Sequence, residues 1–183
     1  MHGPAEPAVT LRVLTPQDAA VIAGWASDPQ FCREAEWTPG QAAYEYERFQ
    51  RRLIETPPKD LIRLGVVSEG HLVGYVDLHG ADPDRRELGF VIGLRNLWGH
   101  GLGLGAAAAG LHHGFVELGL QEIWAEAYEA NRRSTRILRR LGLRETGFGD
   151  IGEFLGAPTR YVQFAIRADE WRHQGSHSAF HPH

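Results

Sequence analysis

The stretch from Glu87 to Leu118, ELGFVIGLRNLWGHGLGLGAAAAGLHHGFVEL, constrains the fold more than any other part of this sequence. It begins as an apolar strand and passes through a glycine-rich loop into an alanine-rich helix. The loop glycines are Gly99, Gly101, Gly103 and Gly105. Glycines allow positive φ angles and close approach of a ligand, and the free N–H groups of a helix's first turn attract anions. The stretch predicts a phosphate site, unless the glycines only make a flexible connection.

The segments before this stretch predict two helices and a set of strands. The expected elements are a strand at 9–14, a helix that begins at Thr15-Pro16 and ends at Asp28-Pro29, a loop at 31–39 and a helix at 40–55. Three strands follow at 61–68, 71–78 and 87–93. Short turns join these three strands, so they predict an antiparallel meander that leads into the glycine loop.

The segments after the glycine loop predict that the sheet continues. A helix connects the strand at 87–93 to a strand at 121–128, so these two should be parallel with a right-handed crossover. Asn131 then caps a helix that Gly142 closes. Two more strands are expected near 144–148 and 158–166. The tail from His173 is polar and is expected to be disordered.

The element order predicts a single α/β domain at residues 9–171, with a mixed, mostly antiparallel central sheet flanked by helices. Residues 1–8 are expected to be a flexible N-terminus, and residues 172–183 a disordered tail that contains histidines. A chain of 183 residues suits one domain with a proper core, and 43% hydrophobic and 23% charged residues are ordinary for a soluble protein.

Charge and cysteine content narrow the classes of function. A formal charge of −4 gives no support to a nucleic-acid-binding surface. Cys32 is alone, so no intramolecular disulfide is possible, which fits a reducing compartment. The sequence shows neither a signal peptide nor a run of about twenty apolar residues that would span a membrane. We therefore expect a cytoplasmic protein with no membrane or nucleic-acid partner.

Three phosphate ligands compete for the glycine loop. A Walker A loop would need Gly-Lys-Ser/Thr, whereas the loop ends Gly103-Leu104-Gly105-Ala106 and no lysine follows Lys59. A dinucleotide fingerprint, G-x-G-x-x-A, is formally present at 101–106 and would suit a nicotinamide-dependent oxidoreductase. However, the preceding strand ends a meander and does not open a run of βαβ units. The third ligand is coenzyme A.

The coenzyme A hypothesis depends on a resemblance to a known family. The sequence Trp98-Gly99-His100-Gly101-Leu102-Gly103 resembles the acetyl-CoA loop of the GCN5-related N-acetyltransferase (GNAT) family. Asn131-Arg132-Arg133-Ser134 is similar to the family's N-x-x-S, and Leu138-Arg139-Arg140-Leu141-Gly142-Leu143 to its L-x-x-x-G-F. With Leu11-Arg12 and Trp25, the resemblance covers residues 9 to 171. The branch that it resembles most is that of the ribosomal-protein N-terminal alanine acetyltransferases.

The chain departs from the family pattern at three places. Trp98 stands where the family has Gln or Arg at the head of the loop, and Leu104-Gly105-Ala106 stands where this branch often has Thr-Glu-Ala. Leu138 stands where many members have a tyrosine, so a tyrosine acid is absent at that position. This last departure leaves open a non-catalytic CoA-binding module.

The resemblance implies acetyl-CoA as cosubstrate and direct transfer of acetyl to a primary amine. The amine would be a protein N-terminus, such as that of a ribosomal protein, or a small amine such as an aminoglycoside or polyamine. Main-chain N–H groups of the loop would hold the pyrophosphate, and the backbone of the preceding strand would pair with the pantetheine arm. The cofactor-binding residues expected on this basis are Val91, Ile92, Gly93, Gly99, His100, Gly101, Leu102, Gly103, Leu104, Asn131 and Ser134.

Three side chains are expected to serve catalysis. Glu87 and Glu153 are candidates for the general base, although either carboxylate could merely attract a cationic amine. Ser134 is the candidate donor to the leaving thiolate, and the alternative is a serine bonded to its own helix start. We expect no metal, because the neighbouring His112 and His113 point in different directions. A homodimer is left open.

Overall fold

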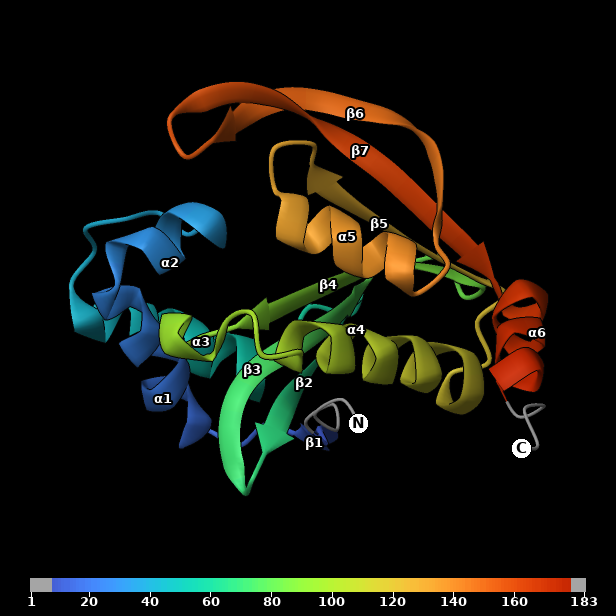
Figure 1. Cartoon of the computed structure of the whole chain (residues 1–183). Helices are drawn as coiled ribbons and strands as arrows, with labels where there is room; N and C mark the ends of the chain where they lie inside the picture. Colours follow the sequence, from blue (N-terminus) through green and yellow to red (C-terminus); the bar gives the residue numbers. More distant parts are fainter. Residues whose placement is uncertain (1–7, 179–183) are drawn as a thin grey trace, which may run out of the picture.

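The computed structural model describes residues 8–178 and builds them around a seven-stranded sheet (Figure 1). The strand order is β1-β2-β3-β4-β5-β7-β6. The strands are β1 Thr10–Val13, β2 Leu61–Ser68, β3 His71–His79, β4 Arg85–Ile92, β5 Glu122–Tyr128, β6 Arg144–Phe154 and β7 Ala157–Arg167. Residues 1–7 and 179–183, which belong to the predicted flexible ends, lie outside the described residues.

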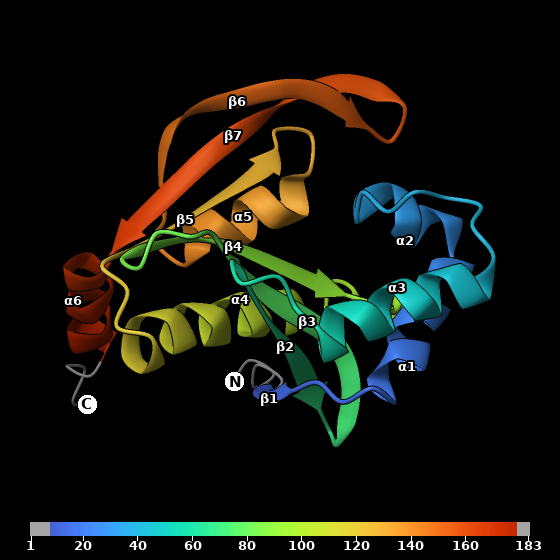
Figure 2. The ribbon, with the colours of Figure 1, turned by 180° about the vertical axis from the view of Figure 1, so that it is seen from behind.

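Helices cover both faces of this sheet (Figures 1 and 2). They are α1 Asp18–Gly24, α2 Pro29–Glu34, α3 Ala43–Glu55, α4 Leu102–His112, α5 Arg132–Arg140 and α6 Ala168–Ser178, with the short turns η1 Trp25–Ser27, η2 Arg95–Leu97 and η3 His113–Glu117. The helices α4 and α5 lie on one face, and α1 and α3 lie on the other. The predicted single α/β domain with helices on a mixed, mostly antiparallel sheet is confirmed.

The strand pairing confirms the expected meander. β2 pairs with β3, and β3 pairs with β4, both antiparallel. β4 then pairs parallel with β5, and α4 makes the crossover between them. The parallel pairing is short, because it joins only 85–87 of β4 to 122–124 of β5. Beyond it the two strands diverge, so the sheet opens into a V (Figure 1). The backbone of β4 from Leu88 to Ile92 therefore has no partner strand on the β5 side.

Alternation along the strands separates an apolar face from a polar one. Leu78, Leu88, Ile123 and Phe164 are at most 2% exposed and form the main core beneath α4 and α5. The other face carries the acids Asp77 and Glu87 of the central strands together with a second apolar cluster of Leu14, Ile22, Trp25, Phe31, Cys32 and Tyr75. The sheet therefore has its main apolar core on the side of α4 and α5, and both a smaller core and carboxylates on the side of α1 and α3.

A helix replaces part of the loop predicted at 31–39. The Asp28-Pro29 pair ends the helical run of α1 and η1 at Ser27, as predicted, and it also starts α2. The Asp28 Oδ1 atom accepts the Gln30 amide at 2.9 Å, and Pro29 occupies the first turn. Asp and Pro favour a helix start as strongly as a helix end, so the predicted loop is replaced by α2 as far as Glu34. The next helix, α3, begins at Ala43 and not at 40.

The predicted disordered tail is wrong for residues 172–178, which belong to α6. Trp171 anchors this helix, because its ring lies 5.3 Å from that of Phe115 and 6.0 Å from that of His112. The domain boundary expected after residue 171 therefore falls inside a helix. The last two strands are also longer than expected, so Glu153 lies in β6 and not in a loop.

Close packing at the end of β4 predicts a sensitive glycine. A Cβ atom on Gly93 would lie 2.0 Å from the Trp25 ring, which is 3% exposed and stacks on Tyr75. We expect Gly93→Ala to lower the free energy of unfolding by about 1–3 kcal/mol, because the ring cannot move without disturbing its own contacts. Denaturant titration measures this change.

A second glycine supplies the control for that experiment. Gly24 lies at the end of α1 with helical φ and ψ angles, and a Cβ there would meet nothing within 4 Å. Gly24→Ala should leave the free energy of unfolding unchanged or raise it by up to about 1 kcal/mol. An equal loss of stability in both variants would show that the contact with Trp25 is not the cause.

Candidate active site

Two cavities flank the V between β4 and β5. The loop-side cavity, of about 380 Å³, is bounded by β4, the glycine loop, α2 and the start of α5. The carboxylate-side cavity, of about 310 Å³, lies against the polar faces of β3, β4, β5 and β7. Phe90, Val91, Asn131 and Ser134 line both. The two cavities therefore meet where the strands diverge.

The glycine loop supplies free main-chain donors to the loop-side cavity. Gly101 has a φ of +86°, a left-handed conformation that turns the chain directly into α4. The first hydrogen bond within the helix is donated by the Gly105 amide to the Gly101 carbonyl at 3.0 Å, which leaves the earlier amides of the turn free. Gly99, Gly101, Gly103 and Leu104 line the cavity. This is the arrangement that holds an anion at a helix N-terminus.

Two residues of the predicted cofactor-binding loop, Leu102 and His100, line neither cavity. The Leu102 side chain is 5% exposed and belongs to the core, so only its main chain is available to a ligand. His100 is exposed and is not among the residues that line either cavity. On the opposite wall, four arginines of α5 add positive charge, namely Arg132, Arg133, Arg136 and Arg140.

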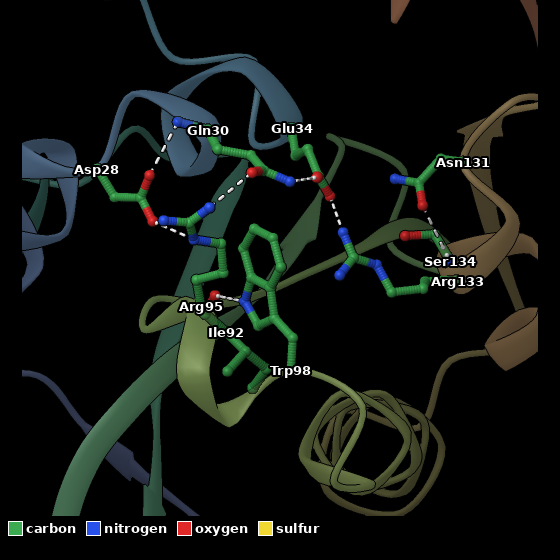
Figure 3. A network of polar contacts seen from close by, with 9 residues as sticks. All are labelled: Asp28, Gln30, Glu34, Ile92, Arg95, Trp98, Asn131, Arg133 and Ser134. Carbon is green, nitrogen blue, oxygen red and sulfur yellow. Dashed lines mark hydrogen bonds and ion pairs between the residues drawn. The ribbon is translucent and has the colours of Figure 1, made fainter. Parts of the chain in front are cut away.

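The end of β4 forms the inner wall of the loop-side cavity. Val91 and Ile92 line it, as predicted for residues that would contact a pantetheine arm. Gly93 does not line it, because its amide donates to the Val73 carbonyl at 2.9 Å and continues the sheet. Trp98 Nε1 donates to the Ile92 carbonyl at 2.8 Å (Figure 3). Trp98, where the family pattern has Gln or Arg, thus ties the glycine loop to β4.

Asn131 and Ser134 lie at the start of α5, between the two cavities. The Asn131 Oδ1 atom accepts the Ser134 amide at 3.2 Å, so the predicted cap is present (Figure 3). The Ser134 hydroxyl makes no hydrogen bond to any other described residue. It is therefore available to a ligand at the junction of the cavities. Leu138, in the position of the missing tyrosine, is 1% exposed.

Five carboxylates line the second cavity, namely Glu34, Glu36, Asp77, Glu87 and Glu126. Asp77 is neutralised, because Arg63 donates to both of its oxygens at 2.7 Å. Glu34 forms an ion pair with Arg133. The other three form no ion pair with a described residue, so the cavity is suited to a cationic ligand.

Glu87 is the carboxylate best placed to take a proton. It is half-buried in β4 beside the junction of the strands. Burial raises its pKa above the ordinary value of 4.5, and the nearby Glu126 carboxylate raises it further. A carboxylate with a raised pKa is a stronger base, which suits a group that must remove a proton near neutral pH.

Glu153, the other predicted base, lies elsewhere. It is exposed in β6 and is not among the residues that line either cavity. Its candidacy depended on the resemblance to a glutamate that follows the last helix in the ribosomal-protein branch, and here Glu153 lies in the long β6–β7 hairpin. The geometry therefore favours Glu87 over Glu153.

Sequence reasoning missed several residues of the carboxylate-side cavity. Glu126 lies on the same sheet face as Glu87, because Trp124, two residues earlier, pairs with Glu87. Tyr128 stacks on Tyr161 with ring centroids 4.0 Å apart. Tyr161 donates to Glu36, and burial together with that carboxylate raises the pKa of Tyr161. The alternation in Glu122–Tyr128 placed Glu126 on the polar face, but strand register was needed to find its neighbours.

Neither a metal-binding cluster nor a membrane-spanning helix is present among the described residues. Among residues 8–178, no group of three or more His, Cys, Asp or Glu side chains could hold a metal ion. None of the helices in that range is long and apolar enough to cross a membrane.

Several acetyltransferases of known structure are similar to this chain. A search of curated proteins finds no match. Among solved structures, a GNAT-family acetyltransferase from Bacillus anthracis has a TM-score of 0.74 at 21% identity, over 89% of this chain and 96% of its own. The spermidine N-acetyltransferase from Vibrio cholerae, in complex with CoA and spermine, has a TM-score of 0.76 at 20% identity, over 90% of this chain and 98% of its own.

A third structure is an aminoglycoside acetyltransferase in complex with coenzyme A, with a TM-score of 0.73 at 16% identity, over 92% of this chain and 99% of its own. These comparisons do not confirm the ribosomal-protein branch. The model of the acetyltransferase (GNAT) domain matches residues 8–144, which is more than half of the chain. The chain therefore belongs to the GNAT family and is an acetyl-CoA-dependent N-acetyltransferase.

Proposed function

We propose that this enzyme acetylates a small cationic amine, with acetyl-CoA in the loop-side cavity and the amine in the carboxylate-side cavity. The observation that carries the proposal is the junction of the two cavities at the V. One side offers helix-terminal N–H groups and arginines to a polyphosphate, and the other offers unpaired carboxylates to an ammonium group. The two reactants would meet at Asn131 and Ser134.

The proposed donor site uses main-chain groups for most of its contacts. The pyrophosphate would lie against the amides of the first turn of α4, where the helix dipole favours negative charge. The pantetheine arm would follow the unpaired edge of β4 in the manner of an added strand. Trp98 holds the loop against β4 through the Ile92 carbonyl, which keeps these two contact surfaces at a fixed separation.

The proposed reaction is a direct attack of the amine on the thioester. Glu87 takes a proton from the ammonium group, and the neutral nitrogen then forms a bond to the thioester carbonyl carbon. The C–S bond breaks, and the thiolate leaves while the Ser134 hydroxyl donates a hydrogen bond to it. The nitrogen, which still carries two protons after the attack, loses one of them to solvent as the amide forms, and solvent protonates the thiolate. No tyrosine acid is needed at Leu138 in this scheme.

A small polycationic acceptor fits the cavity better than a neutral one. Glu36 and Glu126 add negative charge beyond Glu87, more than a single ammonium group requires. The likeness to spermidine and aminoglycoside acetyltransferases supports amines of this type, which carry several positive charges. A protein N-terminus remains the acceptor that the ribosomal-protein resemblance implies.

A variant of the glycine loop tests where the donor binds. Saturating acetyl-CoA should raise the melting temperature of the wild-type protein, because a ligand that binds only the folded state stabilises it. In Gly101→Val this shift should disappear, since a β-branched residue is unfavourable at a φ of +86° and would crowd the phosphate site. Differential scanning fluorimetry measures both values.

The control for this variant carries a similar backbone strain beyond η3, the helical turn that follows α4. Gly119 has a φ of +69°, with open space around it. Gly119→Val should lower the melting temperature of the free protein but keep the shift on adding acetyl-CoA. A full shift in Gly101→Val would contradict the assigned donor site.

The pH dependence of turnover tests the base. Glu87 must be ionised to act, so kcat/KM should rise with pH through its raised pKa. Glu87→Gln should lower kcat about 10²- to 10⁴-fold, the usual contribution of a general base, and remove this limb of the profile. The assay follows release of free CoA with spermidine, an aminoglycoside and an alanine-terminated peptide as acceptors.

Glu153→Gln removes the same charge outside the two cavities and should keep the wild-type profile. If the rise of kcat/KM with pH were lost in Glu153→Gln and kept in Glu87→Gln, Glu153 and not Glu87 would be the base. If none of the acceptors releases CoA although acetyl-CoA binds, the non-catalytic CoA-binding module becomes the better description.

Ser134→Ala tests the stabilisation of the leaving group. The Ser134 amide, and not its hydroxyl, makes the cap hydrogen bond, so the fold should be unaffected. We expect kcat to fall about tenfold to a hundredfold, with little change in the KM for acetyl-CoA, because the hydrogen bond forms only as the thiolate develops. An unchanged kcat would exclude the hydroxyl from the chemistry.

A further inference from the structure

Helix α2 lies across the open end of the V, between the glycine loop and the start of α5 (Figures 1 and 3). On the loop side, Arg95 pairs with Asp28 at 2.8 Å and donates to Gln30 Oε1 at 2.7 Å. On the α5 side, Glu34 forms an ion pair with Arg133. Gln30 Nε2 donates to Glu34 Oε1 at 2.9 Å and joins the two halves of the network. The helix is thus fastened to both walls of the loop-side cavity.

Arg133 is held at this cavity by two neighbours. Its guanidinium lies over the Trp98 ring, 4.3 Å from the ring centroid, and pairs with Glu34. The Glu34 side chain is only 9% exposed, whereas that of Arg133 is 49% exposed. Both residues line the loop-side cavity. The Glu34 carboxylate is therefore paired with the Arg133 guanidinium on the cavity wall that would face the phosphates of the proposed donor.

The residues directly after Glu34 extend over the second cavity. Ala35 lines both cavities, and Glu36 accepts the hydroxyl of Tyr161 in β7. Glu36 has a φ of +57°, a left-handed conformation that is unfavourable for a residue with a side chain. One short segment thus bonds to α5 at the donor side and to β7 at the acceptor side. These contacts, with a hydrogen bond from the next residue, Trp37, to Tyr75 in β3, hold it in a conformation that the backbone disfavours.

We infer that Glu34 and acetyl-CoA compete for Arg133, so that donor binding releases the end of α2 and opens the carboxylate-side cavity. The inference rests on the proposed position of acetyl-CoA in the loop-side cavity. The pyrophosphate of acetyl-CoA carries two negative charges, against one on the Glu34 carboxylate, and each phosphate offers Arg133 the same two-pronged geometry as a carboxylate. Once Arg133 binds phosphate, Glu34 has lost its cation and faces a like charge. The end of the segment is then held to the sheet by the hydrogen bonds of Glu36 with Tyr161 and of Trp37 with Tyr75, and no longer to α5.

Calorimetric titration with acetyl-CoA tests the competition. Glu34→Gln should lower the Kd about tenfold, because the competing charged hydrogen bond is gone, whereas Arg133→Gln should raise it. The double variant should lose most of the gain seen in Glu34→Gln, since Glu34 acts on the donor chiefly through that arginine. Acetylpantetheine, which lacks the phosphates, should bind Glu34→Gln and the wild type equally.

Glu47→Gln is the matched charge control, because Glu47 pairs with Arg51 on the exposed face of α3. It should bind acetyl-CoA with the wild-type Kd. An unchanged Kd in Glu34→Gln, or a gain of the same size with acetylpantetheine, would overturn the competition. So would a gain that persists in the double variant.

Amide hydrogen exchange tests the release of α2. In the wild type, exchange at residues 29–37 should become faster when acetyl-CoA is added, and in Glu34→Gln it should be fast without ligand. Slower exchange in the wild type on binding would show that the segment closes and would refute the inference. These measurements need no acceptor, so a failure to acetylate any amine would count against the proposed function alone.

Discussion

The short parallel pairing of β4 and β5 is the constraint on which the rest of this structure depends. After Glu87 meets Trp124 the two strands separate, which leaves backbone groups of β4 without a partner strand. Such groups are costly when buried, so they favour a site that a ligand or water can reach. The separation also joins the two faces of the sheet at one place. A donor on one face and an acceptor on the other can therefore meet without crossing the core.

The two faces carry charges of opposite sign. The loop side concentrates helix-terminal N–H groups and the arginines of α5, and the opposite side concentrates unpaired carboxylates. Because the neighbouring Glu126 and partial burial both raise the pKa of Glu87, the charge that attracts an ammonium group also makes a better base. Glu34 is the exception, since this carboxylate lies against Arg133 on the positive side. In the proposed competition, this ion pair is what connects donor binding to the position of α2.

Local sequence rules predicted the glycine loop, the meander and the Asn131 cap, because each of these depends on residues within a few positions of one another. The same rules were wrong for residues 31–34, because Asp28-Pro29 both ends the first helical run and starts α2. They were also wrong for the polar tail, because the contact of Trp171 with Phe115 holds α6 in place and is not visible from local composition. Glu153 was predicted from the resemblance to the ribosomal-protein branch, and it lies in the long β6–β7 hairpin.

The sequence by itself determined the fold class and predicted an anion site at the start of α4, since periodicity, glycines and caps act over short distances, and the family resemblance made Glu87 a candidate base. Only the tertiary structure decided which carboxylates surround Glu87 and which lie outside the site. Strand register brings Glu126 to the same face, and a contact across 99 residues brings Glu34 to Arg133. Such contacts depend on how distant elements pack, which no local pattern specifies.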